Sequence, residues 1–332
     1  MKKFKMKSIL ASMACAALLV GCSSDSTSGD AKDQVVVGVT QIAEHPSLDA
    51  AFEGFKKALE DNGYKEGDNV KYDVQNAQGD PNNNKPIADK FVADEVDLIF
   101  ANSTPSAQSA LQATKDIPII FTSVTDPVGA ELVESFEKPG ENITGTSDTH
   151  PDAIATTINF MVDELGAKNI GVIYNTGEQN SVVQVETVKS LVEEKGGTLV
   201  EASVSTSAEV QQAAESLIGR VDAIYMPTDN TVVSAIQSLI TVATNEKIPL
   251  FAGDLDSMEA GAVAASGFNY YDLGYETGLM AVQVLKGEKD PSEIPVSYPQ
   301  SLKLTINTEA AEAQGLEVQD TWTEFAEFYD EK

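Results

Sequence analysis

Short apolar runs alternate with longer amphipathic stretches along most of this chain. Val35–Val39, Leu98–Phe100 and Ile117–Phe121 are continuous apolar runs, typical of strands that are buried on both faces. Stretches such as 47–62 and 180–195 instead carry apolar residues at helical spacing. Strands that alternate with helices predict an α/β fold with parallel sheets and right-handed crossovers.

One stretch of this pattern occurs twice in the sequence. Val96–Pro127 and Val221–Asp256 each open with Val-Asp and a short buried strand, followed by a polar loop, a helix and another buried strand. Thr104, before a proline, and Asp229 stand at the two helix starts, where each is expected to cap the helix. Any two βαβ units resemble one another, so a single match could arise by chance. Segments upstream of both copies also match, and in the same order. The chain is therefore expected to contain a duplicated α/β domain.

The expected elements divide between two lobes, each with a doubly wound parallel sheet. The strands are 35–39, 70–75, 98–100, 117–121, 170–174, 198–203, 222–225, 248–251, 261–265 and 302–306, and the main helices are 47–62, 83–93, 151–165, 180–195, 207–218, 231–245 and 272–285. Asn142–Ser147 is interpreted as a segment that crosses between lobes. Lobe one is expected to comprise residues 34–148 plus 268–292, and lobe two residues 149–267 plus 293–332. Three crossings would form a hinge.

The N-terminal residues have the pattern of an export signal. Four lysines precede the apolar run Ile9–Val20, which is too short for a typical membrane span. Residues 19–22, Leu-Val-Gly-Cys, resemble the lipobox of bacterial lipoproteins, which implies cleavage before Cys22 and a lipid on its sulfur. The alternative is an ordinary secretory peptide with a chance cysteine. We expect a signal peptide at 1–21 and a lipidated, flexible tether at 22–33.

Charge and cysteine content exclude several classes of function. The formal net charge of the 332 residues is −30, and loss of the leader, with four lysines and no acidic residue, would change it to −34. Such a surface repels nucleic acid and anionic lipid headgroups, although acidity can also serve solubility alone. Cys15 lies in the leader, so no thiol remains beyond that of Cys22, and neither disulfides nor a cysteine metal site are expected.

Polar residues follow the duplicated strands, whose carboxyl ends should face one another across a cleft. The first lobe offers mainly uncharged donors and the second adds carboxylates. The candidate ligand-binding residues are Gln41, Asn102, Ser103, Thr104, Thr122 and Ser123 in lobe one, and Asn175, Asn180, Ser181, Thr228, Asp229 and Asp254 in lobe two.

These two walls suit the two charges of a free α-amino acid. Hydroxyls and a helix N-terminus near Ser103 suit a carboxylate, whereas Asp254 suits an ammonium group. Asp229 stands at a helix start, where an aspartate is more often a cap than a ligand contact. Asp126 precedes a proline and is interpreted as a turn residue. The hypothesis requires that Ser103 and Asp254 share one hollow.

Several segments resemble a known family in the same order along residues 35–306. They include GVTQIAEHPSLDAAFEGF, VQNAQGDP, FTSVTDPVGA, NITGTSD, YMPTDNTVVSA, PLFAGD and GFNYYDLG. The chain resembles the substrate-binding lipoproteins of ABC transporters with the type I periplasmic-binding-protein fold, in the tryptophan/tyrosine group. The resemblance implies capture of an aromatic amino acid between two closing lobes and delivery to a membrane permease driven by a separate ATPase. By position, Ser103, Thr122 or Ser123 would hold the carboxylate and Asp254 the ammonium.

Aromatic residues near the expected cleft or hinge offer a surface for a ligand ring. They are Phe121, Tyr174, Phe268, Tyr270 and Tyr271, although most are expected to pack in the core. The only tryptophan, Trp322, lies in the C-terminal tail and is expected to report ligand binding poorly.

Catalytic motifs are absent from the sequence. The only histidines are His45 and His150, without an HExxH motif or a Walker A pattern, so we expect no enzyme, no metal and no cofactor. The protein is expected to be an extracytoplasmic monomer, anchored to the bacterial cell membrane by lipid and free of nucleic acid. A ligand sensor for a membrane receptor and a surface adhesin remain alternative functions on the same scaffold.

Overall fold

The structure, a computed structural model, describes residues 34–329. The predicted signal peptide, Cys22 and the predicted tether lie outside the described residues. Among the residues described, no helix is both long and apolar enough to span a membrane.

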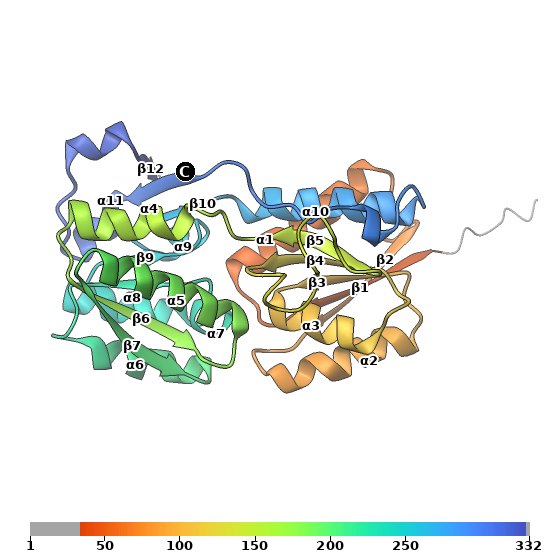
Figure 1. Cartoon of the computed structure of the whole chain (residues 1–332), viewed down its shortest axis with the longest axis horizontal. Coiled ribbons are helices and arrows are strands. Elements are labelled where there is room, and N and C mark those ends of the chain that lie inside the picture. The colour runs from red at the N-terminus through yellow and green to blue at the C-terminus, as the bar shows by residue number, and fades with distance from the viewer. Residues whose placement is uncertain (1–33, 330–332) are drawn as a thin grey trace, which may run out of the picture. The chain divides into compact units, whose positions relative to one another are not determined.

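Two sheets organise the described chain (Figure 1). The first has five parallel strands in the order β2-β1-β3-β4-β5, with bounds β1 Val35–Gln41, β2 Val70–Asn76, β3 Leu98–Asn102, β4 Ile119–Val124 and β5 Ile143–Ser147. The second has the order β12-β11-β10-β9-β8-β6-β7, with bounds β6 Asn169–Asn175, β7 Thr198–Val204, β8 Ala223–Met226, β9 Leu250–Ala252, β10 Ala264–Gly267, β11 Lys303–Asn307 and β12 Glu327–Tyr329. In this sheet only the β10–β11 pairing is antiparallel.

The repeat in the sequence corresponds to a repeated topology. The order β7-β6-β8-β9-β10 in the second sheet reproduces β2-β1-β3-β4-β5 in the first. We call the half built on the first sheet lobe one and the half built on the second sheet lobe two. The predicted fold class, α/β with two parallel-sheet lobes, is confirmed.

Helices join most successive strands, although β4 and β5 are joined without one. Their bounds are α1 Pro46–Asp61, α2 Asn84–Ala93, α3 Thr104–Ala113, α4 Ala153–Asn159, α5 Gln179–Glu194, α6 Val210–Leu217, α7 Asn230–Val233, α8 Ile236–Glu246, α9 Ser257–Ala260, α10 Tyr270–Leu285 and α11 Thr308–Ala313. Short 3₁₀ turns cover Pro81–Asn83, Ser207–Glu209, Pro291–Glu293 and Asp320–Glu324.

Helices cover both faces of the first sheet. On strand β3, Ile99 belongs to a buried cluster with Phe91 of α2, whereas its neighbour Phe100 belongs to a second cluster with Phe55 of α1 and Met280 of α10. Successive side chains of a strand point to opposite faces, so a strand covered on both sides reads as a continuous apolar run. This explains the pattern that the sequence showed at residues 98–100.

Helix α10 returns to lobe one, as the sequence analysis expected, and packs closely on α1 (Figure 1). A Cβ atom on Gly274 would lie 1.8 Å from the Ala51 carbonyl oxygen, and one on Gly54 would lie 1.9 Å from the Tyr271 carbonyl oxygen. Only glycine permits this approach of the two backbones. Contact with α1, β4 and β5 fixes α10 to the first sheet although it follows β10 of the second.

Several expected elements differ from those observed. Asn142–Ser147 is not simply a crossing segment, since Ile143–Ser147 pairs with β4 as strand β5, and its β-branched residues suit that role. The helix expected over 151–165 is α4 followed by a π-helical turn at Phe160–Glu164. The helix expected over 231–245 is divided into α7 and α8.

The chain passes between the two sheets three times, after β5, after β10 and before β11. Ser297 still contacts lobe one, because its N–H donates to the Gly145 carbonyl and its own carbonyl accepts from the N–H of Ser147. Contacts with lobe one therefore extend beyond the expected limit at residue 292. The other expected lobe boundaries stay predictions.

Candidate functional site

Residues from both lobes enclose a small cavity where strands of the two sheets end. Lobe one, lobe two and the crossing segments all contribute: its lining is His45, Ser47, Leu48, Ser123, Asp148, Asn180, Thr228, Asn230, Val233, Asp254 and Tyr270. Its volume is about 10 Å³, about the smallest that can hold one water molecule. We refer to it as the cleft cavity.

Hydrogen bonds between the lobes close this cavity. The Ser47 hydroxyl at the start of α1 donates to Asp254 Oδ1 at 3.0 Å, and His45 Nε2 lies 3.4 Å from Asn230 Oδ1. His45 and Ser47 come from lobe one, whereas their partners come from lobe two. The structure therefore has the two lobes in direct polar contact across the cleft.

The local backbone aims Ser123 at the cavity. Ser123 has φ of 55°, in the left-handed region that disfavours residues other than glycine, and the pairing of β4 with β5 shifts register between Phe121 and Val124. Such a bulge redirects a side chain, and a strained backbone of this kind often marks a functional site. The Ser123 hydroxyl is buried and has no hydrogen-bond partner within residues 34–329.

Four of the twelve expected ligand-binding residues line the cleft cavity: Ser123, Asn180, Thr228 and Asp254. Buried polar atoms normally have partners, so atoms without one are informative. In the part of the chain that the structure describes, the Ser123 hydroxyl and Asn180 Oδ1 have none. Asp254 instead accepts from the Ser47 hydroxyl and from both the N–H and the hydroxyl of Ser257. These four residues remain candidate ligand contacts.

The other lobe-one candidates are buried but do not line the cavity. Gln41 donates to the Ala43 carbonyl and to Asp49, and Asn102 Nδ2 donates to Gln41 and to the Leu48 carbonyl. These bonds connect the ends of β1 and β3 to the start of α1. Gln41 and Asn102 thus support the loop that presents His45 and Ser47.

The hydroxyl residues around α3 and β4 also differ from expectation. Ser103, with φ of 104°, directs its hydroxyl to Ser106 and does not line the cleft cavity. The required hollow between Ser103 and Asp254 is therefore not found. Ser123, which was also expected to hold the carboxylate, shares the cavity with Asp254 instead. The expected capping by Thr104 is wrong, because Thr104 is the first residue of α3 and its buried hydroxyl has no partner among residues 34–329.

The Thr122 hydroxyl lies in a chain of buried hydroxyls. It is 2.9 Å from the hydroxyl of Thr146, which is 2.7 Å from that of Thr277, and Thr277 donates to the Leu273 carbonyl. This chain fastens α10 to strands β4 and β5. Thr122 therefore joins these elements and does not line the cleft cavity, and its expected ligand contact stays a prediction.

Asp229 caps helix α7, which was the structural alternative to a ligand contact, and it does not line the cleft cavity. Oδ1 accepts from the N–H of Val232 at 2.8 Å, and Oδ2 accepts from the N–H of Asn175 at 2.6 Å. Burial, with Glu178 nearby, raises the pKa of Asp229 to about 7. Asn175 donates to Thr231, and Ser181 accepts from Asn180, so these two also support the loops rather than line the cavity.

Several lining residues were not among the candidates. Asp148 and Tyr270 come from two crossing segments, and the Tyr270 hydroxyl donates to Asp148 Oδ2 at 2.8 Å. Asn230 is held by buried Glu178, which accepts from its N–H and its side-chain amide. His45 of lobe one also lines the cavity. Lone polar residues in loops give no periodic signal, so only proximity in the fold reveals them.

The electrostatic character of the cavity is acidic. Asp148 and Asp254 both line it, and none of the described lining residues is a lysine or an arginine. Burial lowers the pKa of His45 despite the nearby carboxylate of Asp254, so the ring is neutral at pH 7. The cavity therefore favours a ligand that brings a positive charge.

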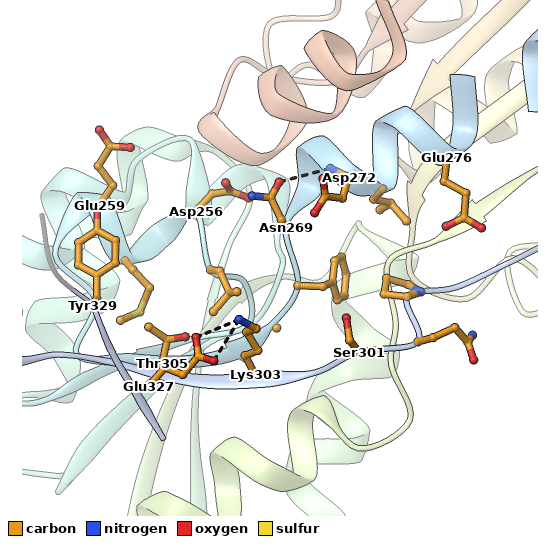
Figure 2. A pocket seen from close by; sticks show the side chains of 17 residues that line it. Asp256, Glu259, Asn269, Asp272, Glu276, Ser301, Lys303, Thr305, Glu327 and Tyr329 are labelled. Carbon is orange, nitrogen blue, oxygen red and sulfur yellow. Dashed lines mark hydrogen bonds and ion pairs between the residues drawn. The ribbon is translucent and has the colours of Figure 1, made fainter. Parts of the chain in front are cut away.

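A larger cavity, of about 630 Å³, lies outside this site (Figure 2). Carboxylates of Asp256, Glu259, Asp272 and Glu276 surround it, and its lysine, Lys303, pairs with Glu327. None of the twelve candidate residues lines it. No cluster of three or more potential metal ligands occurs within the described chain.

A family model, described as ABC transporter substrate binding protein, matches residues 36–327. A tyrosine-binding protein of Clostridioides difficile (strain R20291) is 46% identical over 314 residues, which cover 92% of this chain and 90% of that protein. The chain belongs to the ABC transporter substrate-binding proteins.

Two relatives of solved structure can be compared with this substrate-binding protein. A Streptococcus pneumoniae protein in complex with L-Trp is 34% identical and has a TM-score of 0.83, with 89% of this chain and 99% of that one covered. A ligand-free, open structure of a Clostridium difficile substrate-binding protein with adhesive properties is 44% identical, covers 90% and 100%, and has a TM-score of 0.64. The structure is thus more similar to the ligand-bound relative, although its sequence is more similar to the open one.

Family membership bears on several predictions. The resemblance to substrate-binding proteins of ABC transporters is confirmed, and more distant solute-binding proteins of solved structure share the fold. The chain is an extracytoplasmic solute-binding protein and not an enzyme, which the sequence analysis also predicted. Its partners are those of the family, a small solute and the membrane components of an ABC transporter.

Proposed function

We propose that this substrate-binding protein captures an aromatic amino acid, such as tyrosine or tryptophan, for an ABC importer. The observation that carries the proposal is one enclosed cavity with the Ser123 hydroxyl on one side and the Asp254 carboxylate on the other. The tyrosine-binding relative and the tryptophan-bound relative support the aromatic side chain.

The two walls match the two charged groups of an amino acid. Ser123 offers a buried hydroxyl donor to a carboxylate, and Asn180 and Thr228 add polar groups from lobe two. Asp254 offers a carboxylate to the ammonium group, where a charge-assisted hydrogen bond is stronger than a neutral one. A ligand that reaches both walls binds the closed arrangement better than either lobe alone, so it favours closure.

The side chain of the ligand would lie against apolar lining residues. Of the five aromatic residues considered in the sequence, Tyr270 lines the cavity, together with Leu48 and Val233, and Phe268 stacks on Tyr270 with ring centroids 5.3 Å apart. Phe121 is in the core of lobe one, and the Tyr174 hydroxyl bonds to Glu201. A cavity of about 10 Å³ is too small for the whole amino acid, so the cleft must be wider with the ligand bound than it is in this structure.

Titration calorimetry on the purified protein tests this function. We expect L-tyrosine, L-tryptophan or L-phenylalanine to bind, and L-leucine and glycine to bind more weakly or not at all. Asp254→Asn should weaken binding by about 1–3 kcal/mol, since it removes the charge from a buried hydrogen bond. Mass spectrometry of ligand released on denaturation identifies the natural ligand. Failure of every aromatic amino acid to bind would overturn the proposal.

We propose further that Cys22 carries a lipid that anchors the protein to the membrane, and that the folded part is a monomer. The lipobox-like residues before Cys22 support the anchor. Cys22→Ser should release the protein from membranes into the medium or periplasm, with aromatic amino-acid binding unchanged. Retention of the variant in the membrane fraction would argue against lipidation.

An adhesive role is a second candidate, favoured by the relative that is described as having adhesive properties. Asp254→Ala distinguishes the two functions in a cell-binding assay. If the variant folds, loses its ligand and still binds cells, adhesion is independent of the cleft. A sensor role for a membrane receptor would be indicated if genes for a permease and an ATPase were absent beside this one.

A further inference from the structure

Asp148 is a buried carboxylate at the hinge that the expected ligand-binding set did not include. It directly follows β5, and its backbone N–H donates to the Val124 carbonyl at 3.2 Å. The Tyr270 hydroxyl donates to Oδ2 at 2.8 Å, whereas Oδ1 is buried and has no hydrogen-bond partner within residues 34–329. Oδ1 of Asp148 is therefore available to accept a hydrogen bond from a ligand in the cleft cavity.

Asp254, in contrast, is largely occupied by the protein. Its two oxygens accept three hydrogen bonds, one from Ser47 and two from Ser257. A carboxylate has about four lone-pair sites, so Asp254 retains about one for a ligand. An ammonium group has three donors, and Asp254 alone cannot satisfy them.

The groups around Asp148 favour a cation. Burial raises the pKa of Asp148, and the charge of Asp254, which lines the same cavity, adds to this effect. Burial raises the pKa of Tyr270, and the charges of Asp148, Asp254 and Asp256 add to this effect. His45, the remaining titratable lining group, is neutral because burial lowers its pKa. No described lining residue supplies a positive charge to balance these carboxylates.

We infer that Asp148 is a second receptor for the ammonium group of the ligand, shared with Asp254, and that Tyr270 positions it. This inference rests on the proposed function, since it names the group of the amino acid that Asp148 binds. Its free Oδ1 and the remaining site on Asp254 supply acceptors for the ammonium from the hinge and from lobe two.

Asp148 and Tyr270 lie in the hinge, so an ammonium group bound by Asp148 would contact the hinge directly. Asp148 begins the first crossing segment, after β5, and Tyr270 ends the second, after β10. Their hydrogen bond joins these two segments, so an ammonium group on Asp148 touches the part of the chain whose conformation changes on closure. A ligand without the ammonium would lack this contact.

A cycle of variants and ligands tests the inference. Titration calorimetry compares wild type, Asp148→Asn and the control Asp152→Asn, an exposed carboxylate nearby. The ligands are L-tyrosine and L-tryptophan, each paired with its analogue that lacks the amino group, 3-(4-hydroxyphenyl)propionate or indole-3-propionate. We expect Asp148→Asn to weaken amino-acid binding about tenfold or more and to leave binding of the analogues within about threefold. The control should change neither.

The other possible outcomes would overturn the inference. Equal loss for amino acids and analogues would give Asp148 a structural role only, and no loss for either would remove it from the site; both results overturn the inference. Absence of aromatic amino-acid binding by wild type would overturn the proposed function and this inference together.

Tyr270→Phe keeps the question answerable if Asp148→Asn does not fold. This variant leaves the charge of Asp148 but removes its donor, so the pKa of Asp148 should rise further. Amino-acid affinity should then begin to fall at a higher pH than in wild type. An unchanged pH profile would show that Tyr270 does not position Asp148.

Discussion

Two serines end neighbouring strands of lobe one in a backbone conformation that is costly for them. Ser103 after β3 has φ of 104° and Ser123 in β4 has φ of 55°. Each costs of the order of 1 kcal/mol relative to glycine. The hydroxyl of Ser123 lines the cleft cavity and that of Ser103 does not. Strain at Ser123 therefore has a functional explanation, and that at Ser103 a local one, through Ser106.

Ser123→Gly should separate stability from function. Relief of the left-handed φ should leave the free energy of unfolding unchanged or raise it by up to about 1 kcal/mol, while the lost hydroxyl weakens amino-acid binding. Thermal melting and titration calorimetry measure the two effects. The matched variant Ser103→Gly should relieve similar strain without loss of affinity. Equal loss of affinity in both variants would contradict the role of Ser123.

Affinity for an amino acid should fall as the solution becomes acidic. Burial raises the pKa of Asp148 to about 6, with Tyr270 and Thr125 partly opposing it. A proton on Asp148 competes with the ammonium of the ligand, so affinity is full above this pKa and falls by up to about tenfold per pH unit below it. Calorimetry between pH 8 and pH 5 measures the slope, which Asp148→Asn should flatten. If affinity falls equally steeply with pH in Asp148→Asn, a group other than Asp148 takes up the proton.

At the scale of elements, the contact between α1 and α10 depends on small residues. Gly54 and Gly274 each allow backbone of the facing helix within a distance that a Cβ could not tolerate. A Cβ on Gly278 would lie 2.6 Å from the Ala58 Cβ. Glycine inside a helix otherwise costs about 1 kcal/mol relative to alanine. These glycines therefore serve the packing that holds α10 on the first sheet.

Gly274→Val should destabilise the protein strongly. Its Cβ would lie 1.8 Å from the Ala51 carbonyl oxygen, so the helices must separate, and we expect a loss of about 3 kcal/mol or more. Urea unfolding measures the change. Leu279→Val, at a position of α10 that is 39% exposed, controls for helix propensity and should cost a few tenths of a kcal/mol. Similar midpoints for the two variants would refute the close packing.

Much of the element order could be predicted from the sequence because buried parallel strands leave long apolar runs. The repeated βαβ pattern predicted the two sheets. Polar residues that follow strands were the basis for choosing Ser123, Asn180, Thr228 and Asp254, which line the cleft cavity. Strand β5 was missed as a strand because ITGTS is short and polar for a core strand. Asp148 and Tyr270 were missed as a pair because 122 residues separate them along the chain.

At the scale of the molecule, closure and charge act together. The structure is more similar to a tryptophan-bound relative than to a ligand-free, open one. It brings buried carboxylates together in a chain whose formal charge is already −30. Closing the cleft without a cation therefore concentrates negative charge, and closing it around an ammonium group relieves that charge.

The ligand-free protein should become more stable on mild acidification. Burial raises the pKa of Asp229 and of Asp256 to about 7 and that of Asp148 to about 6, all above the unfolded value near 4. Since the folded state binds more protons in this window, the penalty is full above these pKa values and is relieved as pH falls towards 5.

Thermal melting from pH 8 to pH 5 checks this expectation. The melting temperature should rise by roughly 2–4 °C for each kcal/mol gained. Asp256→Asn should reduce the rise, since it removes one of the three raised groups. A melting temperature that falls steadily over the same range would contradict the assignment.

The position of Trp322 has a practical consequence for spectroscopy. This indole is 2% exposed and packs edge-on against Phe160, in a cluster that contains Phe251 and Ile306 of the second sheet. Its emission will follow the melting of lobe two alone, and lobe one will be visible only through its tyrosines. A shift assay based on tryptophan emission would thus miss a ligand or a mutation that alters lobe one, unless the two halves unfold as a single cooperative unit.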